Sequence, residues 1–235
     1  MRRVFLLLAF AAILGAAPIS DWFLGNTLAA SVWTVLTPLG GTAAQSSPPG
    51  VTIAAPSGAI HDPLVTGAVT IKQTVANTDF NVIFQIQTTP TGGTNNFSAV
   101  GILAYQDDSN YATANYQLTG TSAYNFLLQN TVASVTTSTT LSRGSGDTFP
   151  LWINFSRISN VFGAKLSSNG TSWTDVGGTQ TAAFTVNSIR LAVDNYNNTA
   201  GSTVAYATKV NLFCNASGTT TPVCIPKTLF RSVTF

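Results

Sequence analysis

Apolar and polar residues alternate with a period of two along most of the chain beyond its first 20 residues. In the segment 78–88, apolar residues occupy every second position from Phe80 to Ile86, and polar residues fill most positions between them. The segments 151–157 and 188–195 repeat this alternation. Because successive side chains of a strand point to opposite sides, the pattern predicts strands with one buried face.

Further strands are expected where short runs of this kind lie between turn residues. These strands are expected at 50–55, 67–75, 98–106, 111–118, 122–129, 131–138, 160–167 and 203–213. The turn signals are Thr91-Gly92-Gly93, Asp108-Ser109-Asn110, Gly144-Ser145-Gly146, Asn169-Gly170 and Gly177-Gly178. Residues 42–50 are expected to form a loop between early strands. Many short strands with regular breaks predict an all-β fold in which two antiparallel sheets pack as a sandwich or jelly roll.

The first residues have the pattern of a secretory leader. Arg2 and Arg3 precede a continuous apolar run at 4–14, and small residues follow at the usual cleavage spacing. Pro18 directly after this point leaves the cleavage site open. We expect residues 1–17 to be a signal peptide, with a retained anchor or buried N-terminal strand as the alternative. The protein is then secreted or held at the cell surface, without a stable membrane span after the leader is removed.

The mature chain is expected to form one β-sandwich at 18–213, followed by a C-terminal tail at 214–235. Cys214 and Cys224 flank a short polar loop, and a disulfide between them suits an oxidising compartment. Two free thiols in a flexible tail are the alternative. Metal binding by this pair is disfavoured because no third or fourth soft ligand lies nearby.

Composition narrows the functional classes. Charged residues make up 8% of the chain and the net charge is +2, so the clustered cations that bind nucleic acid are missing. The chain contains no glutamate, and His61 is its single histidine. All acidic side chains are therefore aspartates, which restricts the acid and base chemistry that the chain can offer.

Three segments together resemble a known superfamily. They are DWFLGNTLAASVW at 21–33, GILAYQDDSNY at 101–111 and LWINFSRISNVFGAKLSSNGTSWTDVG at 151–177. Over about residues 20–213 the chain resembles the concanavalin A-like lectin/glucanase superfamily, and more narrowly the small modules similar to the C-terminal domain of β-xylosidases. Trp22 departs from this pattern, because those modules usually have a second Asp there. The resemblance implies a two-sheet jelly roll, a fold that serves lectins, hydrolases and passive modules alike.

Enzymatic activity is not expected from these residues. Glycoside hydrolysis usually needs two positioned carboxylic groups, and the glutamate-rich motif of the superfamily's catalytic members cannot exist here. Asp107 and Asp108 are adjacent, so they face opposite ways on a strand or solvent in a turn. A Ser-His-Asp site would need His61, which lies beside Asp62, and no G-x-S-x-G elbow occurs.

Carbohydrate binding is a better match to the polar positions of the predicted strands. A glycan groove needs an aromatic platform and planar polar groups, and the non-core positions supply both. The candidates are Trp152, Asn154, Gln85, Gln87, Gln106, Asn115, Gln117, Arg190 and Asp194. The alternative is that these side chains bond only to water and to one another. Tyr105, Tyr111 and Trp173 are expected to pack within the sandwich, as their counterparts in the resembling modules do.

The Asp-Asp-Ser-Asn stretch is expected to be a hairpin turn, with calcium as the rival interpretation. Calcium prefers several oxygen ligands, which Asp107, Asp108 and Asn110 offer. Asp21 is a further candidate, because the superfamily often holds a structural ion near its first strand. No other cofactor is indicated.

The favoured function is therefore a non-catalytic, lectin-like module that binds carbohydrate or an extracellular polymer. The alternative is a structural or assembly protein of a surface layer, filament or virion that associates with copies of itself. A glycoside hydrolase is the third and least favoured possibility.

Overall fold

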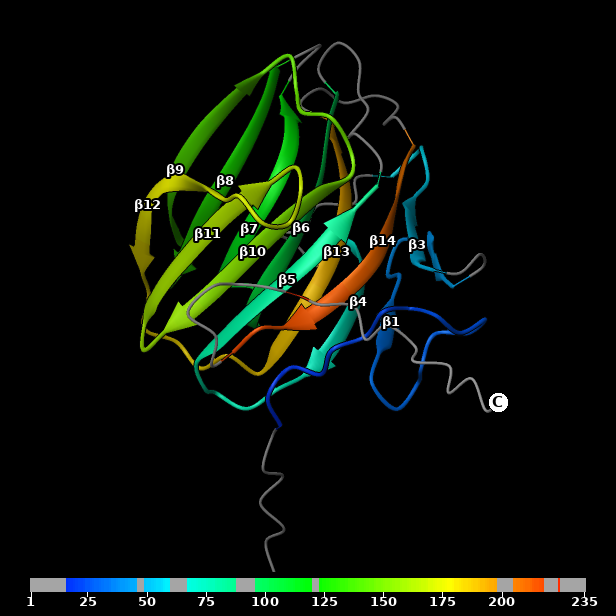
Figure 1. The fold of residues 1–235 in the computed structure, drawn as a ribbon, viewed down its shortest axis with the longest axis horizontal. Coiled ribbons are helices and arrows are strands. Elements are labelled where there is room, and N and C mark those ends of the chain that lie inside the picture. The colour runs from blue at the N-terminus through cyan, green and yellow to red at the C-terminus, as the bar shows by residue number, and fades with distance from the viewer. Residues whose placement is uncertain are drawn as a thin grey trace, which may run out of the picture.

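Two antiparallel seven-stranded sheets face each other in the computed structural model, which describes residues 16–45, 49–59, 67–87, 96–119, 123–197, 205–217 and 224. Sheet I runs in the order β1 (Thr34–Leu36), β4 (Val69–Thr74), β13 (Ser188–Asn197), β6 (Asn96–Asp107), β7 (Asn110–Thr119), β8 (Ala123–Val132) and β9 (Val135–Gly144). Sheet II runs in the order β12 (Thr174–Thr181), β11 (Val161–Ser167), β10 (Leu151–Ile158), β5 (Phe80–Ile86), β14 (Tyr206–Asn215), β3 (Val51–Ala55) and β2 (Thr42–Ala44). In Figure 1, sheet II lies in front of much of sheet I. The predicted two-sheet jelly roll is confirmed.

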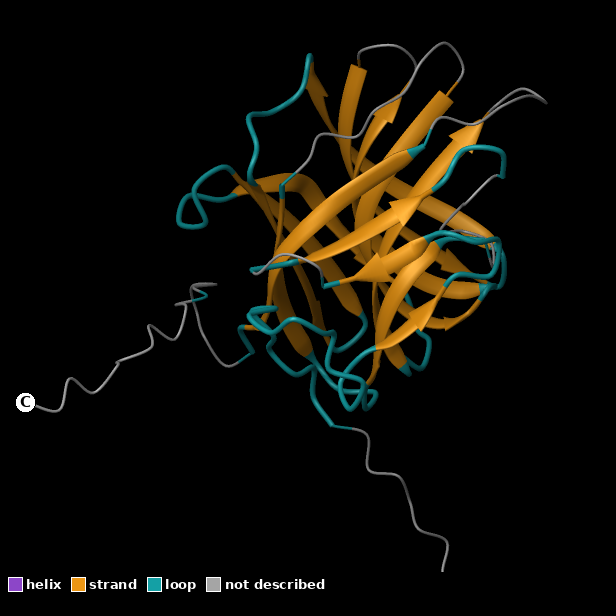
Figure 2. Ribbon diagram, turned by 90° about the vertical axis from the view of Figure 1, so that its right-hand side faces the viewer, coloured by secondary structure: helices purple, strands orange, loops and turns teal. Residues whose placement is uncertain are grey.

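The described residues are drawn as strands and loops only (Figure 2). None of them belongs to a helix with the length and apolar character that crossing a membrane requires.

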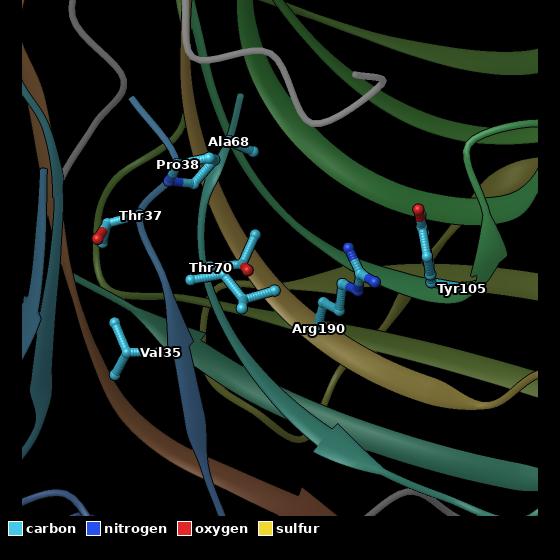
Figure 3. A pocket seen from close by; sticks show the side chains of 8 residues that line it. Val35, Thr37, Pro38, Ala68, Thr70, Tyr105 and Arg190 are labelled. Carbon is cyan, nitrogen blue, oxygen red and sulfur yellow. The ribbon is translucent and has the colours of Figure 1, made fainter. Parts of the chain in front are cut away.

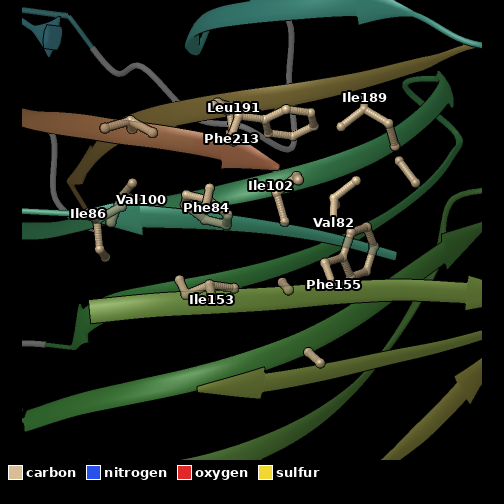
Figure 4. Close-up of a cluster of buried hydrophobic side chains, with 14 of the residues drawn as sticks. Val82, Phe84, Ile86, Val100, Ile102, Ile153, Phe155, Ile189, Leu191 and Phe213 are labelled. Carbon is tan, nitrogen blue, oxygen red and sulfur yellow. The ribbon is translucent and has the colours of Figure 1, made fainter. Parts of the chain in front are cut away.

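The core lies between the sheets and is built from the alternating apolar positions. Phe84 and Phe155 of sheet II and Ile102 and Leu191 of sheet I are each at most 1% exposed, and they meet in the layer that Figure 4 shows. Full burial of one such side chain stabilises the fold by about 1.5–3 kcal/mol relative to leaving it in water. The period-two pattern therefore specifies which side of each strand faces inward.

Most predicted strands are present, but three were missed. The edge strands β1 and β2 contain three residues each, which is too short to show a period, and β2 lies in the segment expected to be a loop. The strand β12 contains Gly177-Gly178, which we expected to be a turn. These glycines have positive φ values of 99° and 157° and lie where the pairing with β11 changes register, so they form a bulge. The Asp175 carboxylate accepts both of their N–H groups.

The predicted disulfide between Cys214 and Cys224 is present. Cys214 lies within β14, so the strand continues past the expected domain boundary at 213 as far as Asn215. The expected signal peptide lies outside the described residues, apart from Ala16 and Ala17.

Candidate functional site

The side chains predicted to line one glycan groove lie on two opposite surfaces. By alternation, Asn115 and Gln117 of β7 point outward from sheet I, as do Arg190 and Asp194 of β13. The strands β5 and β10 belong to sheet II, so their outward side chains lie on the far side of the sandwich. The prediction of a single groove is therefore wrong, because an outward position exists on both sheets. The predicted residues on the sheet II side are Gln85, Gln87, Trp152 and Asn154.

Gln106 lies on neither of these two surfaces, contrary to the prediction that it lines the groove. It lies near the end of β6, where the pairing with β7 shifts register. Its side-chain oxygen accepts the N–H of Thr185, and its backbone carbonyl accepts a bond from Asn187. Gln106 therefore fastens the segment that precedes β13 to the end of β6.

The outward face of sheet II is covered at Trp152. This half-buried indole packs against a cluster that contains Ile83, Leu212, the disulfide and two further tryptophans, Trp22 and Trp173. The turn between β11 and β12 approaches so closely that a Cβ on Gly170 would lie 3.1 Å from the Trp152 indole nitrogen.

Asn154 lies on the same face and is likewise engaged. Its side chain is 3% exposed, and its amide donates to the side chain of Asn81 and to the carbonyl of Val82. Trp152 and Asn154 are thus held by protein contacts on this face.

The outward face of sheet I has a cleft at one end, and we call it the open face, although its central residues Leu103, Thr113 and Asn115 are only 1–4% exposed. Its central positions form cross-strand rows whose register is set by the antiparallel pairing. One row contains Thr70, Ala192, Gly101, Asn115, Leu127 and Thr140, and the next contains Lys72, Arg190, Leu103, Thr113, Gln129 and Ser138. A Cβ on Gly101 would lie 2.6 Å from the Cβ of Asn115, so glycine is needed where β6 and β7 come close. Gly101 and Ala192 also leave this part of the open face without large side chains.

A cleft of about 450 Å³ lies at the β1 end of the open face. Figure 3 shows it between the β1 segment on one side and the side chains of Arg190 and Tyr105 on the other. Its lining residues are Val35, Leu36, Thr37, Pro38, Ala68, Thr70, Tyr105 and Arg190. Apolar walls thus face a cation, an aromatic ring and a hydroxyl, a combination typical of small-ligand sites.

Two buried polar atoms of the open face have no protein partner. Thr70 is 4% exposed, and its hydroxyl oxygen makes no hydrogen bond within the protein. Asn115 is equally buried; its amide nitrogen makes only long bonds, to Thr113 at 3.5 Å and Gln129 at 3.4 Å, and its side-chain oxygen makes none. Buried polar atoms are nearly always bonded in folded proteins, so each of these two oxygens calls for a bond to water or to a bound ligand.

Arg190, Tyr105 and Asp108 form a connected group beside the cleft. The guanidinium carbon of Arg190 lies 3.3 Å from the centre of the Tyr105 ring. The Tyr105 hydroxyl donates to the Asp108 carboxylate at 2.5 Å. Burial, followed by this hydrogen bond, raises the pKa of Tyr105 to about 12, so the phenol keeps its proton at neutral pH. Burial lowers the pKa of Arg190 from its ordinary value of 12.5, although an arginine stays charged in proteins.

The residues predicted to hold calcium belong to two separate places. Asp107 accepts the backbone N–H of Ser109 and the side-chain amide of Asn110, both at 2.9 Å, which is the geometry of a capped turn. Asp21 forms a bridge with Phe213 of sheet II, and its carboxylate accepts the Trp33 indole N–H at 2.8 Å. Within the described ranges, no three His, Cys or Asp side chains gather as a metal site would require. A calcium ion at the β6–β7 turn stays a prediction.

Sequence reasoning named one lining residue of the cleft, Arg190, but missed the cleft itself. Tyr105 was assigned to packing, and Thr70 and Lys72 were not considered, because threonine and lysine are common on exposed strands. The strand β1, which forms one wall of the cleft, has only three residues and is too short to show a period. The only hint was the occurrence of small residues at Gly101 and Ala192 on outward positions of adjacent strands.

No protein-family model and no curated protein matches the chain. Solved structures with a similar fold include the xyloglucan-locus protein GH43B of Bacteroides ovatus, with a TM-score of 0.60, 11% identity and coverage of 84% of this chain and 39% of that protein. The Bacillus licheniformis β-glucanase has a TM-score of 0.57 and 9% identity, over 85% of this chain and 98% of that one. The catalytic domain of a Thermotoga petrophila endo-1,3-β-glucanase has a TM-score of 0.58 and 6% identity, over 85% and 96%.

The chain therefore has the concanavalin A-like jelly-roll fold, as the resemblance implied. It spans about two fifths of the length of the GH43 proteins and nearly the whole of the two glucanases. The expectation that the chain is not an enzyme is contradicted, because glycoside hydrolases share its fold over most of its length. That exclusion rested on the missing glutamate motif and on the geometry of the adjacent Asp107-Asp108 pair, and it did not consider aspartates that folding brings together from distant segments.

Proposed function

We propose that the protein binds carbohydrate at the open face of sheet I. The observation that carries the proposal is the cleft of about 450 Å³, which combines apolar walls with the buried, unpartnered hydroxyl of Thr70. The fold supports the same conclusion, because solved proteins that share it are named as acting on polysaccharides.

The chemistry of the open face suits a sugar. Sugar rings present C–H groups that pack on apolar and aromatic surfaces, which Val35, Pro38 and Tyr105 supply. Sugar hydroxyls donate and accept hydrogen bonds, and the Thr70 hydroxyl, which is buried beside the cleft, lacks a protein partner. An ordered polar group that gains its first partner on binding adds both affinity and orientation.

The test is binding to a panel of soluble polysaccharides by affinity electrophoresis, in the wild type and in two variants. Tyr105→Ala removes one wall of the cleft, and we expect it to weaken binding by about 10-fold or more, as loss of an aromatic anchor does. Lys165→Ala is the matched control, because Lys165 is exposed on β11 of sheet II. Equal binding by wild type and Tyr105→Ala, with both folded by thermal melting, overturns the proposal.

Glycoside hydrolysis is the second candidate, and the similar solved structures favour it. Asp108 and Asp194 are the described carboxyl groups at this face, at opposite ends of it. Ser188, which pairs with Tyr105, lies about 20 Å along β13 from Asp194 at about 3.3 Å per residue. Paired glycosidase carboxyls lie about 5–10 Å apart, so one of these aspartates would have to act with a different second group. A reducing-sugar assay on the polysaccharides that bind, with Asp194→Asn and Asp108→Asn, decides this candidate.

An extracellular location is part of the proposal. The Cys214–Cys224 disulfide supports it, because such bonds persist in oxidising compartments. Self-association stays a prediction. The mass, N-terminal residue and elution volume of the exported protein test processing and assembly together.

A further inference from the structure

Two cationic residues occupy paired strand positions on the open face. Lys72 of β4 and Arg190 of β13 are directly paired across the two strands. Both alternate with core residues, among them Ile71 and Leu191, so both side chains lie on the outward surface. Like charges placed opposite each other on one face of a sheet repel and destabilise it. An anion bound at this point would therefore be attracted by both charges.

The protein neutralises this pair only in part, because the charge of Asp108 acts on Arg190 but forms no ion pair with it. In the described part of the chain, the one ion pair joins Arg143 to Asp147, so neither Lys72 nor Arg190 takes part in one. The nearest acid along the sheet is Asp108, and it accepts a hydrogen bond from the Tyr105 hydroxyl at 2.5 Å.

Asp194 is too distant to neutralise them. It lies about 13 Å from Arg190 along β13, by the rise of a strand. Its carboxylate accepts the backbone N–H of Ala99 at 2.5 Å. The row that contains the two cations continues through Leu103, Thr113, Gln129 and Ser138 and holds no acid.

The guanidinium of Arg190 is held in place for a ligand. It stacks on the ring of Tyr105, and its Nε–H donates a long bond of 3.4 Å to the Ser188 hydroxyl. Figure 3 shows the group directed into the cleft, between Thr70 and Tyr105. A planar guanidinium fixed in this way binds carboxylate or sulfate oxygens through paired N–H donors.

We infer that the ligand of the cleft is an anionic carbohydrate, whose carboxylate or sulfate group lies against Arg190 and Lys72 while its ring lies over Thr70 and Ala192. This inference rests on the proposed function and narrows its substrate class. The anion relieves the repulsion between the two cations, and the unpartnered Thr70 hydroxyl bonds to the ring. A neutral glycan can bond to the Thr70 hydroxyl but supplies no negative charge to Arg190 and Lys72.

The test compares polygalacturonate, dextran sulfate, unmodified dextran and laminarin by affinity electrophoresis at low and moderate salt. We expect one or both anionic polymers to bind about 10-fold or more tightly than either neutral one, and to weaken as salt screens the charges. Preference for polygalacturonate assigns the group as a carboxylate, and preference for dextran sulfate assigns it as a sulfate. Single-stranded DNA is included as a polyanion without this sugar chemistry.

Variants that each remove one positive charge show which residues bind the anionic polymer. Arg190→Gln and Lys72→Gln are each expected to weaken binding of the anionic polymer by about 10-fold, because each removes a charged donor. Lys165→Gln removes the same charge from the exposed outer side of sheet II and should leave binding within about twofold of wild type. Arg190→Lys keeps the charge but loses the paired donors, so it should fall between wild type and Arg190→Gln. Thermal melting of every variant separates lost binding from lost folding.

Each result has one meaning. Equal affinity for neutral and anionic polymers, with Tyr105→Ala still impaired, overturns this inference and leaves carbohydrate binding intact. Absence of binding to every polysaccharide overturns the proposed function itself. DNA binding as tight as that of the anionic polymers, or equal losses in Lys165→Gln, identifies general charge attraction and also overturns the inference.

Discussion

Single side chains decide which surface of this sandwich is available to a ligand. Trp152 was the natural platform in the sequence, and Thr70 attracted no attention. In the folded protein Trp152 is half-buried against the β11–β12 turn, whereas Thr70 lines the cleft with a buried hydroxyl that has no protein partner. Alternation correctly predicted that Trp152 points away from the core, but it carried no information on what covers that side chain.

Thr70→Val tests the role of the hydroxyl. Valine has nearly the same shape, and the oxygen that it removes is buried without a protein partner. We expect the variant to be more stable than wild type by about 1 kcal/mol, since the desolvation of an unpaired hydroxyl costs about 1–3 kcal/mol. We expect its affinity for carbohydrate to fall, because the ligand loses that bond. Urea unfolding and affinity electrophoresis measure the two effects, and reduced stability with unchanged affinity contradicts this assignment.

Trp152→Ala should lower the stability of the protein and leave carbohydrate binding intact, which is the opposite of what we expect for Thr70→Val. The indole packs with Ile83, Leu212 and the disulfide, and because it is only half-buried, its removal should destabilise the protein by less than the ~3–5 kcal/mol of a core tryptophan. Carbohydrate binding should persist below the unfolding transition, since the open face is on the other sheet. A variant with wild-type stability that no longer binds would move the site back to the surface predicted from the sequence.

At the scale of elements, the sequence predicted the positions of the strands more accurately than the sheet to which each strand belongs. The Asp107–Asn110 turn and the strands around it follow from local alternation and turn chemistry. The sheet to which each strand belongs depends on crossovers, because consecutive strands such as β4 and β5 lie in different sheets. Local pattern cannot supply that information, which is why outward residues of β10 and β7 were assigned to one groove.

The β6–β7 turn should make the folding stability of the protein depend on pH in the acidic range. Hydrogen bonds to the carboxylate, the Asn110 amide first, lower the pKa of Asp107 below its ordinary 3.8. A lowered pKa means that this stabilisation is present above pH about 4 and is lost as pH falls below it. Asp107→Asn should therefore melt at a lower temperature than wild type at pH 6, with a smaller difference at pH 3. A difference that does not shrink in acid would contradict the role of the charged carboxylate.

For the whole molecule, the fold follows from the sequence but the function requires the arrangement of both faces. The jelly roll was predictable because each strand shows one apolar side, and the resemblance named the same fold. The cleft was not predictable, because it needs a three-residue edge strand and side chains from β4, β6 and β13 that are far apart in sequence. The exclusion of enzymatic activity failed for a related reason, since it considered only carboxyl groups that are adjacent in the sequence.

The central claim is that carbohydrate binds to the open face of sheet I. The most direct measurement is a titration of the isotope-labelled protein with the preferred oligosaccharide, followed by backbone amide chemical shifts. The account predicts shifts that cluster at Thr70, Gly101 and Arg190 and leave Ile83, Trp152 and Cys214 unchanged. Shifts confined to the second group would place the ligand on sheet II and contradict the account.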